Sequence, residues 1–120
     1  MRWIKKLFAL FAGLAIVVSL SACSLQAIDM KKITAVIDVR TAAEYQAGHL
    51  QGAVNVDVES PDFASNIGAF DKAGSYVLYC HSGRRAGIAK DTMTSMGFST
   101  LINAGAIGDA SSATGLPIVQ

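Results

Sequence analysis

The most informative segment of the sequence is Tyr76-Val77-Leu78-Tyr79-Cys80-His81-Ser82-Gly83-Arg84-Arg85-Ala86-Gly87. Its first four residues form a short apolar run that predicts a buried strand, and residues 88–96 are typical of a helix. Cys80 is therefore expected at the carboxyl end of a strand, on a tight loop that opens a helix. Open α/β sheets place their ligand sites at this edge, so we expect the functional site here.

The loop after Cys80 has the composition of an anion-binding cradle. Its backbone N–H groups converge, the helix N-terminus adds partial positive charge, and Arg84 and Arg85 add formal charge. All three favour a thiolate, the nucleophilic form of cysteine. Alternatively, Cys80 is a small hydrophobic residue at a buried strand end, as lone free cysteines usually are. The adjoining Ser-Gly-Arg-Arg run favours the functional interpretation.

The N-terminus has the three parts of a secretory signal. Arg2, Lys5 and Lys6 form a basic region, residues 7–20 are almost wholly apolar, and Leu20-Ser21-Ala22-Cys23 supplies a cleavage point. These last four residues resemble the lipobox of bacterial lipoproteins. The resemblance implies cleavage before the cysteine, a diacylglycerol on its sulfur and acylation of the new amino terminus. The alternative is an uncleaved membrane anchor, since the uncharged stretch is long enough to cross a bilayer.

We accordingly divide the chain into a signal peptide (residues 1–22), the lipidated Cys23 with a short tether (23–32), and one globular domain (33–120). Two or more acyl chains give stable anchoring, so we expect a lipid-anchored domain that faces the periplasm from the bacterial cell envelope. In enterobacterial lipoproteins an Asp after the lipidated cysteine favours the inner membrane. The resemblance with Ser24 at this place therefore favours the outer membrane.

Charge and cysteine content change once the signal is removed. The chain carries ten basic and nine acidic residues, and loss of the three in the signal leaves seven basic against nine acidic. No basic patch remains except the loop, so we expect no nucleic-acid partner. With Cys23 lipidated, Cys80 is the only thiol of the mature chain, which we expect to be a monomer. An unpaired thiol in an oxidising compartment is a liability unless it has a function.

The rest of the domain alternates strands and helices. Strands are expected at residues 35–38, 53–56, 75–79 and 100–102, and helices are expected to begin at Thr41, Ser60 and Arg84. This order predicts an α/β fold with a central, mostly parallel sheet flanked by helices on both faces. Beyond Gly105 the pattern fades, although residues 106–110 fit one helical turn.

Finer signals place the helix ends and faces. Thr41 and Glu44 fit a capping box, and a proline suits the first turn of the helix that begins at Ser60. Gly97 suits the position after the end of the third helix. The inward-facing residues of that helix are expected to be Ile88, Met93 and Met96.

Three groups of residues together resemble the rhodanese-domain family. The opening group is Asp38-Val39-Arg40-Thr41 with Glu44-Tyr45 and residues 48–53. The central group, Cys80-His81-Ser82-Gly83-Arg84-Arg85, is similar to an active loop of the form C-x-S-G-x-R. The closing group is Met96-Gly97-Phe98 with Asn103-Ala104-Gly105. The likeness spans residues 33–108 and, with the export signal, implies a rhodanese-like domain of the small exported sulfurtransferase kind.

The resemblance implies transfer of sulfane sulfur. Cys80 would attack the outer sulfur of thiosulfate or a similar donor, and cyanide or a thiol would remove the sulfur from the resulting persulfide. Arg85 would support the loop and Arg84 would face the oxygens of the donor. Neither a cofactor nor a metal is implied. The residues expected to bind substrate and form the loop are His81, Ser82, Gly83, Arg84, Arg85 and Ala86.

Asp38 and Arg40 are candidate supporting residues. Asp38 ends a neighbouring strand, where its carboxylate either orients Arg40 or Arg85 or merely caps the strand. We expect Arg40 to pair with an acidic neighbour rather than bind substrate, and the family signature indicates a structural role for Glu44. His81 adjoins the nucleophile, and its ring either favours the thiolate when charged or faces solvent.

Two other functions remain open. Related phosphatases and arsenate reductases have five residues between cysteine and arginine, whereas four lie between Cys80 and Arg85, so this loop fits a sulfur atom better than a tetrahedral oxyanion. A non-catalytic persulfide carrier or sulfide-binding envelope module would use the same cysteine without rapid turnover. The chain also departs from the family after Gly105, where Ala106 replaces a glycine and residues 107–120 contain no aromatic.

Overall fold

The computed structural model describes residues 27–120, so the predicted signal peptide and Cys23 lie outside the described residues. Within this range no helix has the length and apolar character needed to cross a membrane. The elements in chain order are the 3₁₀ turn η1 (Met30–Lys32), β1 (Ala35–Asp38), α2 (Ala42–Ala47), β2 (His49–Leu50), β3 (Val54–Asn55), α3 (Phe63–Ile67), β4 (Ser75–Cys80), α4 (Arg84–Ser95), β5 (Thr100–Ala106), α5 (Ile107–Thr114) and β6 (Ile118–Val119).

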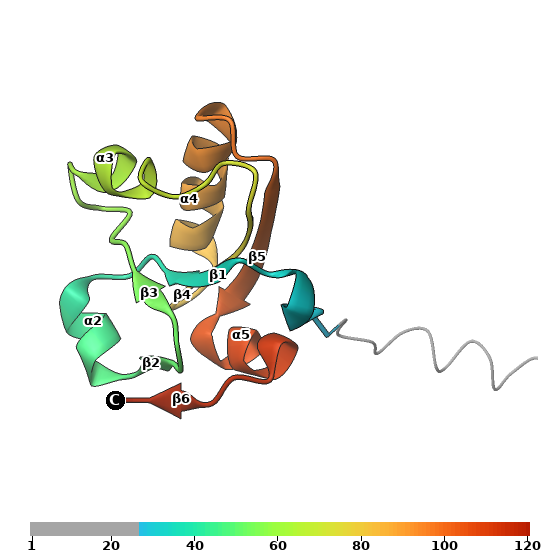
Figure 1. Ribbon diagram of the computed structural model, residues 1–120. Coiled ribbons are helices and arrows are strands. Elements are labelled where there is room, and N and C mark those ends of the chain that lie inside the picture. The colour runs from blue at the N-terminus through green and yellow to red at the C-terminus, as the bar shows by residue number, and fades with distance from the viewer. Residues whose placement is uncertain (1–26) are drawn as a thin grey trace, which may run out of the picture.

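A four-stranded parallel sheet forms the centre of the domain (Figure 1). Its strand order is β3-β1-β4-β5, and all three pairings are parallel. Parallel neighbours need crossover connections, which α3 and α4 provide before and after β4. Strand β4 is covered on both faces, and five of its six residues are buried. The prediction of an α/β fold with helices on both faces of a mostly parallel sheet is confirmed.

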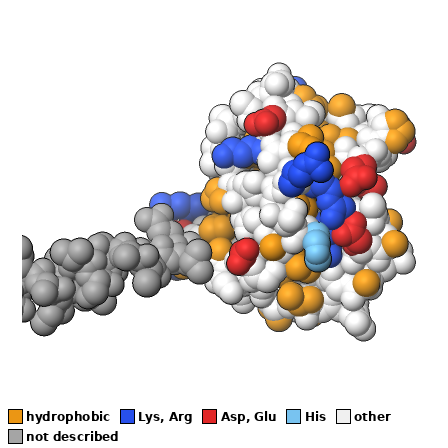
Figure 2. Space-filling model, turned by 180° about the vertical axis from the view of Figure 1, so that it is seen from behind, with side chains coloured by type: hydrophobic (Ala, Val, Ile, Leu, Met, Phe, Trp, Pro, Cys, Tyr) orange, Lys and Arg blue, Asp and Glu red, His pale blue; other side chains and the backbone are white. Residues whose placement is uncertain are grey.

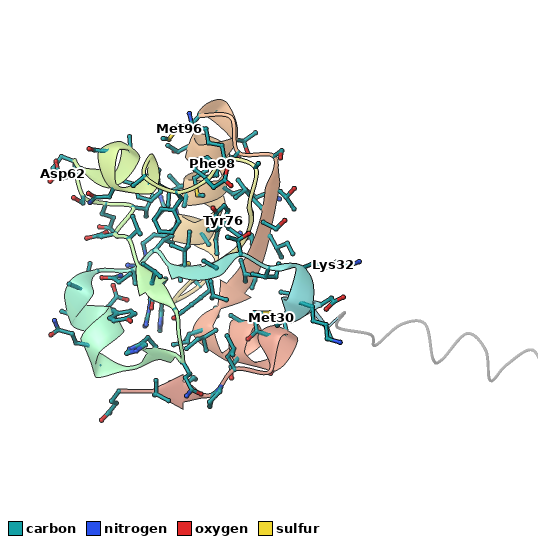
Figure 3. The ribbon with its side chains drawn as sticks, viewed as in Figure 1. Met30, Lys32, Asp62, Tyr76, Met96 and Phe98 are labelled. Atoms are coloured by element: carbon teal, nitrogen blue, oxygen red, sulfur yellow. The ribbon has the colours of Figure 1, made fainter. Side chains whose placement is uncertain are left out.

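Helices α3 and α4 cover one face of the sheet. Successive strand residues point to opposite faces, so Ile37, Tyr76 and Leu78 all enter the cluster on this side. Figure 3 shows Tyr76 and Phe98 between the sheet and these helices. The Tyr76 ring meets the edges or faces of Phe70 and Phe98 at centroid distances of 5.7 Å each, an arrangement favoured by aromatic quadrupoles.

The other face is covered by η1, α2, α5 and β2. Val36 and Val77 point to this side, and β2 pairs with β6 in a small antiparallel sheet (Figure 1). Ile28 and Met30, which belong to the predicted tether, pack against this cluster. The N–H of Ile28 donates to the carbonyl of Ala113 at 2.9 Å, so the packed domain extends back at least to this residue.

The predicted start of the second helix is wrong. The helix begins at Phe63 rather than Ser60. The Ser60 hydroxyl accepts the N–H of Asp62 at 3.1 Å, and the Ser60 carbonyl accepts the N–H of Phe63 at 3.1 Å. These bonds form a turn, which competes with a first helical turn at this place. Phe63 and Ile67 are nevertheless buried, as their spacing predicted.

The predicted inward face of α4 is also partly wrong. Ile88 is 49% exposed, whereas Met93 is buried. The helix meets the sheet through Ala86 and Ala89, which are fully buried. Their small side chains allow close approach of the helix, and Ile88 lies outside that contact stripe. Strand β5 continues four residues beyond the predicted end, and the C-terminal residues form α5 and β6.

Candidate active site

The sulfur of Cys80 lies at the carboxyl edge of the sheet, because Cys80 is the last residue of β4. The N–H of Gly83 donates to Cys80 Sγ at 2.8 Å. Gly83 has a φ of +92°, in the left-handed region that favours glycine, and directly precedes α4. The N–H and the helix N-terminus both place positive partial charge beside the sulfur.

The sulfur is covered in this structure. Cys80, a free cysteine, is 0% exposed, and Ala86 behind it is also fully buried. His81 and Ser82 are exposed. A nucleophilic sulfur is expected to be open to its substrate, and Cys80 is instead fully buried.

Arg85 joins the start of α4 to α2. Its Nη1 donates to Glu44 Oε1 at 2.7 Å and its Nη2 donates to Oε2 at 2.9 Å, a two-pronged pair. Glu44 also completes the predicted capping box with Thr41, which is confirmed. The hydrogen bond from Arg85 lowers the pKa of Glu44 from its ordinary 4.5 to about 2, although burial opposes this. The same bond raises the pKa of Arg85, so both groups are charged at neutral pH.

Arg84 and His81 lie on the open side of the loop. Both side chains are exposed, and the ion pairs found within residues 27–120 involve neither of them. Figure 2 shows basic, acidic and histidine side chains gathered side by side on one face of the domain. Arg84 is therefore available to an anion that arrives from solvent.

Asp38 and Arg40 form a second, buried pair. Arg40 Nε donates to Asp38 Oδ1 at 3.0 Å and Nη2 donates to Oδ2 at 2.7 Å, with the Arg40 side chain 7% and the Asp38 side chain 0% exposed. Asn55 Nδ2 donates to the carbonyls of both residues. This confirms that Arg40 pairs with an acidic neighbour. The option that Asp38 orients Arg85 is wrong, because Asp38 is engaged with the residue two positions along its own chain.

One residue at this edge was missing from the predicted site. Asn103 Nδ2 donates to the carbonyl of Gly83 at 3.0 Å, and its Oδ1 accepts the N–H of Gly105 at 2.9 Å. From the sequence, residues 103–105 stand out only as part of the closing group of the family resemblance. An amide two residues before a glycine at the end of a strand is the available signal, but the sequence alone does not show that it reaches the loop.

Two other features bear on the chemistry. Among the described residues no cluster of His, Cys, Asp and Glu could hold a metal ion. A cavity of 560 Å³ is lined by residues that include Ile33, Ser75, Thr100 and Ile102. Ser75 and Thr100 are the first residues of β4 and β5, so this cavity lies at the amino end of the strands. It is remote from Cys80 and takes no part in the site.

These observations define an α/β domain with a cysteine under a helix-opening loop, at the carboxyl edge of a parallel sheet. A family model described as a rhodanese-like domain matches residues 22–107. The chain belongs to the rhodanese-like family.

Three relatives are informative. Thiosulfate sulfurtransferase PspE of Escherichia coli K12 is 36% identical over 73 residues, which cover 61% of this chain and 70% of that protein. A putative sulfur carrier protein, YrkF of Bacillus subtilis, is 31% identical over 78 residues, 65% of this chain and 41% of that one. A solved structure, "rhodanese with anions from E. coli", superposes with a TM-score of 0.59 at 33% identity and covers 72% of this chain and 96% of its own. Family and relatives support sulfurtransferase activity in general.

Proposed function

We propose that this chain is a sulfurtransferase in which Cys80 carries the transferred sulfur as a persulfide. The observation that carries the proposal is the hydrogen bond from Gly83 N–H to Cys80 Sγ at the mouth of α4. A nucleophilic sulfur must be anionic, and this arrangement provides a donor and a helix N-terminus for that charge. Membership of the rhodanese-like family and the name of the PspE relative agree with it.

The reaction consists of two displacements. The Cys80 thiolate attacks the outer sulfur of thiosulfate, a new S–S bond forms, and the old S–S bond breaks as sulfite leaves with its electron pair. An acceptor, cyanide or a thiol, then attacks the terminal sulfur and restores the thiolate. The persulfide that forms in the first step is consumed in the second, and sulfite leaves before the acceptor reacts, so ping-pong kinetics are expected. The loop N–H groups stabilise the anionic sulfur in both.

Arg84 and Arg85 have different roles in this reaction. Arg85 is engaged with Glu44 and holds the loop to the body of the domain. Arg84 is exposed and offers charge-assisted donors to the oxygens of the dianionic donor. His81 and Ser82, also exposed, are the residues that move when the donor enters.

We also propose that Cys23 is lipidated and that the protein faces the periplasm. The proposal rests on the signal in residues 1–23. The packed domain begins near Ile28, whose neighbours Ile33 and Thr100 lie at the amino end of the sheet. Cys80 lies at the opposite, carboxyl end. An anchor at Cys23 would therefore leave the active loop directed away from the membrane.

Steady-state thiosulfate:cyanide assays of wild type and Cys80→Ser test the function. Serine is nearly isosteric but far less acidic and forms no persulfide, so we expect a folded variant without activity. Activity close to wild type in this variant would overturn the mechanism. The YrkF relative favours a sulfur carrier as the second candidate. Loading of one sulfur per chain without turnover would support the carrier instead.

A further inference from the structure

Strand β5 is irregular directly beside Cys80. Its register pairs Leu78 with Asn103 and Cys80 with Ala106, so β5 has one residue more than β4 over this span. Such a bulge bends a strand and re-aims its side chains, and bulges concentrate next to active sites. Gly105 lies in the bulge with a φ of +80°. The extra residue thus brings the end of β5 against the loop, where a Cβ on Gly83 would lie 3.2 Å from the Cα of Gly105.

We propose that Asn103 is a positioning residue that fixes the root of the active loop and thereby aims the Gly83 N–H at the Cys80 sulfur. Its Nδ2 donates to the Gly83 carbonyl at 3.0 Å, and that carbonyl also accepts the N–H of Gly87 at 3.0 Å. Gly83 is thus held from β5 and from α4 at once. The inference rests on the proposed function, because it concerns the same sulfur.

The side chain at position 103 must donate and accept together. Oδ1 accepts the N–H of Gly105, a group that the bulge takes out of the regular ladder. Nδ2 donates to Gly83. An amide has both functions at this reach, whereas a carboxylate only accepts and a hydroxyl is shorter. The two bonds connect the bulge to the loop.

This arrangement separates the fixed part of the loop from its moving part. Asn103 holds Gly83, while His81 and Ser82 are exposed and have no comparable restraint from a strand. The donor can enter by displacing these two residues while the Gly83 N–H stays directed at Sγ. Asn103 itself is exposed and contributes little to the core. Its replacement should therefore affect the sulfur more than the fold.

The test compares wild type with Asn103→Ala and Asn103→Thr, and Asn66→Ala serves as the control at a distant asparagine. Threonine suits a strand, keeps a hydroxyl near the Gly105 N–H and adds no charge, but is too short for Gly83. Asn66 is an exposed asparagine on α3. The protein is first stripped of bound sulfur with cyanide. The rate of iodoacetamide alkylation at Cys80 is then followed against pH by mass spectrometry of its peptide.

In both position-103 variants we expect the pH of half-maximal alkylation to rise by roughly half a unit to one unit, because the Gly83 N–H is displaced from the anionic sulfur. The turnover number for thiosulfate:cyanide transfer should fall about tenfold, which is less than the effect of removing a hydrogen-bond donor altogether. The Michaelis constant for thiosulfate should change little, because Arg84 is untouched. Asn66→Ala should match wild type in all three.

The outcomes separate this inference from the proposed function. A pH profile unchanged in both position-103 variants, with a lower melting temperature, would overturn the positioning role and leave Asn103 a structural residue. An upward shift of the profile in a protein without sulfur transfer would uphold Asn103 and overturn the proposed function instead. Alkylation needs no sulfur donor, so the two results do not depend on each other.

Discussion

Two arginine–carboxylate pairs lie at the carboxyl edge of the sheet and differ in what they join. Asp38 and Arg40 are two residues apart, and their side chains are 0% and 7% exposed. Glu44 and Arg85 are 41 residues apart, and their side chains are 34% and 20% exposed. The first pair holds the end of β1 within the fold, and the second positions the helix that carries the active loop. Burial and sequence separation thus distinguish a folding role from a positioning role.

The largest expected effect comes from breaking the buried pair. In Asp38→Ala the guanidinium of Arg40 stays buried without its carboxylate, so we expect a loss of about 3–5 kcal/mol of unfolding free energy. Urea unfolding, monitored by circular dichroism, measures this loss of unfolding free energy. The double variant Asp38→Ala/Arg40→Ala should recover part of the loss. A single-variant loss below about 1 kcal/mol, the range of exposed pairs, would contradict the difference drawn between the two pairs.

Breaking the partly buried pair of Glu44 and Arg85 should reduce stability less, and activity more, than breaking the buried pair. In Arg85→Ala we expect a loss of about 1 kcal/mol, and a rise of the thiosulfate Michaelis constant because the loop is no longer held. Arg85→Lys keeps the charge but not the two-pronged geometry and should resemble Arg85→Ala in activity. If Arg85→Ala had the kinetics of wild type, the positioning role of this pair would be lost.

The pair of Glu44 and Arg85 should make the stability of the domain depend on pH. Arg85 lowers the pKa of folded Glu44 from 4.5 to about 2, so its contribution is present above pH 4.5 and is lost as the pH falls toward 2. Glu44→Gln keeps the capping box and removes the charge. The stability difference between wild type and this variant should shrink across that window. A difference that stays constant between pH 4.5 and pH 2 would show that Glu44 is not ionised against Arg85.

The smallest effect on stability is expected at Arg84, which has no carboxylate partner among residues 27–120. Arg84→Ala should change the unfolding free energy by less than about 0.5 kcal/mol. The thiosulfate Michaelis constant should rise, because one charge-assisted donor is removed. Melting temperatures that fall equally in Arg84→Ala and Arg85→Ala would remove the distinction between the two arginines.

The sequence predicted what depends on local pattern. Strand β1, the capping box of Thr41 and Glu44, and the place of Cys80 at a strand end all follow from periodicity and neighbouring residues. Contacts between distant residues were not predictable in this way. The bond from Asn103 to Gly83 depends on a bulge between two strands. Likewise, the exposure of Ile88 depends on how closely two alanines let α4 approach the sheet.

The burial of the Cys80 sulfur could not be predicted from the sequence either. Cys80 is 0% exposed, and its sulfur accepts the Gly83 N–H. Both features depend on the tertiary arrangement of the loop, in which Gly83 has a φ of +92° and a Cβ on it would lie 3.2 Å from the Cα of Gly105. Residues 1–26 are outside the described part, so the lipid anchor stays a prediction.

The central claim is that Cys80 carries the sulfur, and intact-mass analysis of the purified protein after exposure to thiosulfate tests it most directly. We predict one added sulfur atom per chain, removed by cyanide with formation of thiocyanate, and none in Cys80→Ser. A wild-type protein that gains no sulfur, or a Cys80→Ser protein that gains one, would contradict the claim.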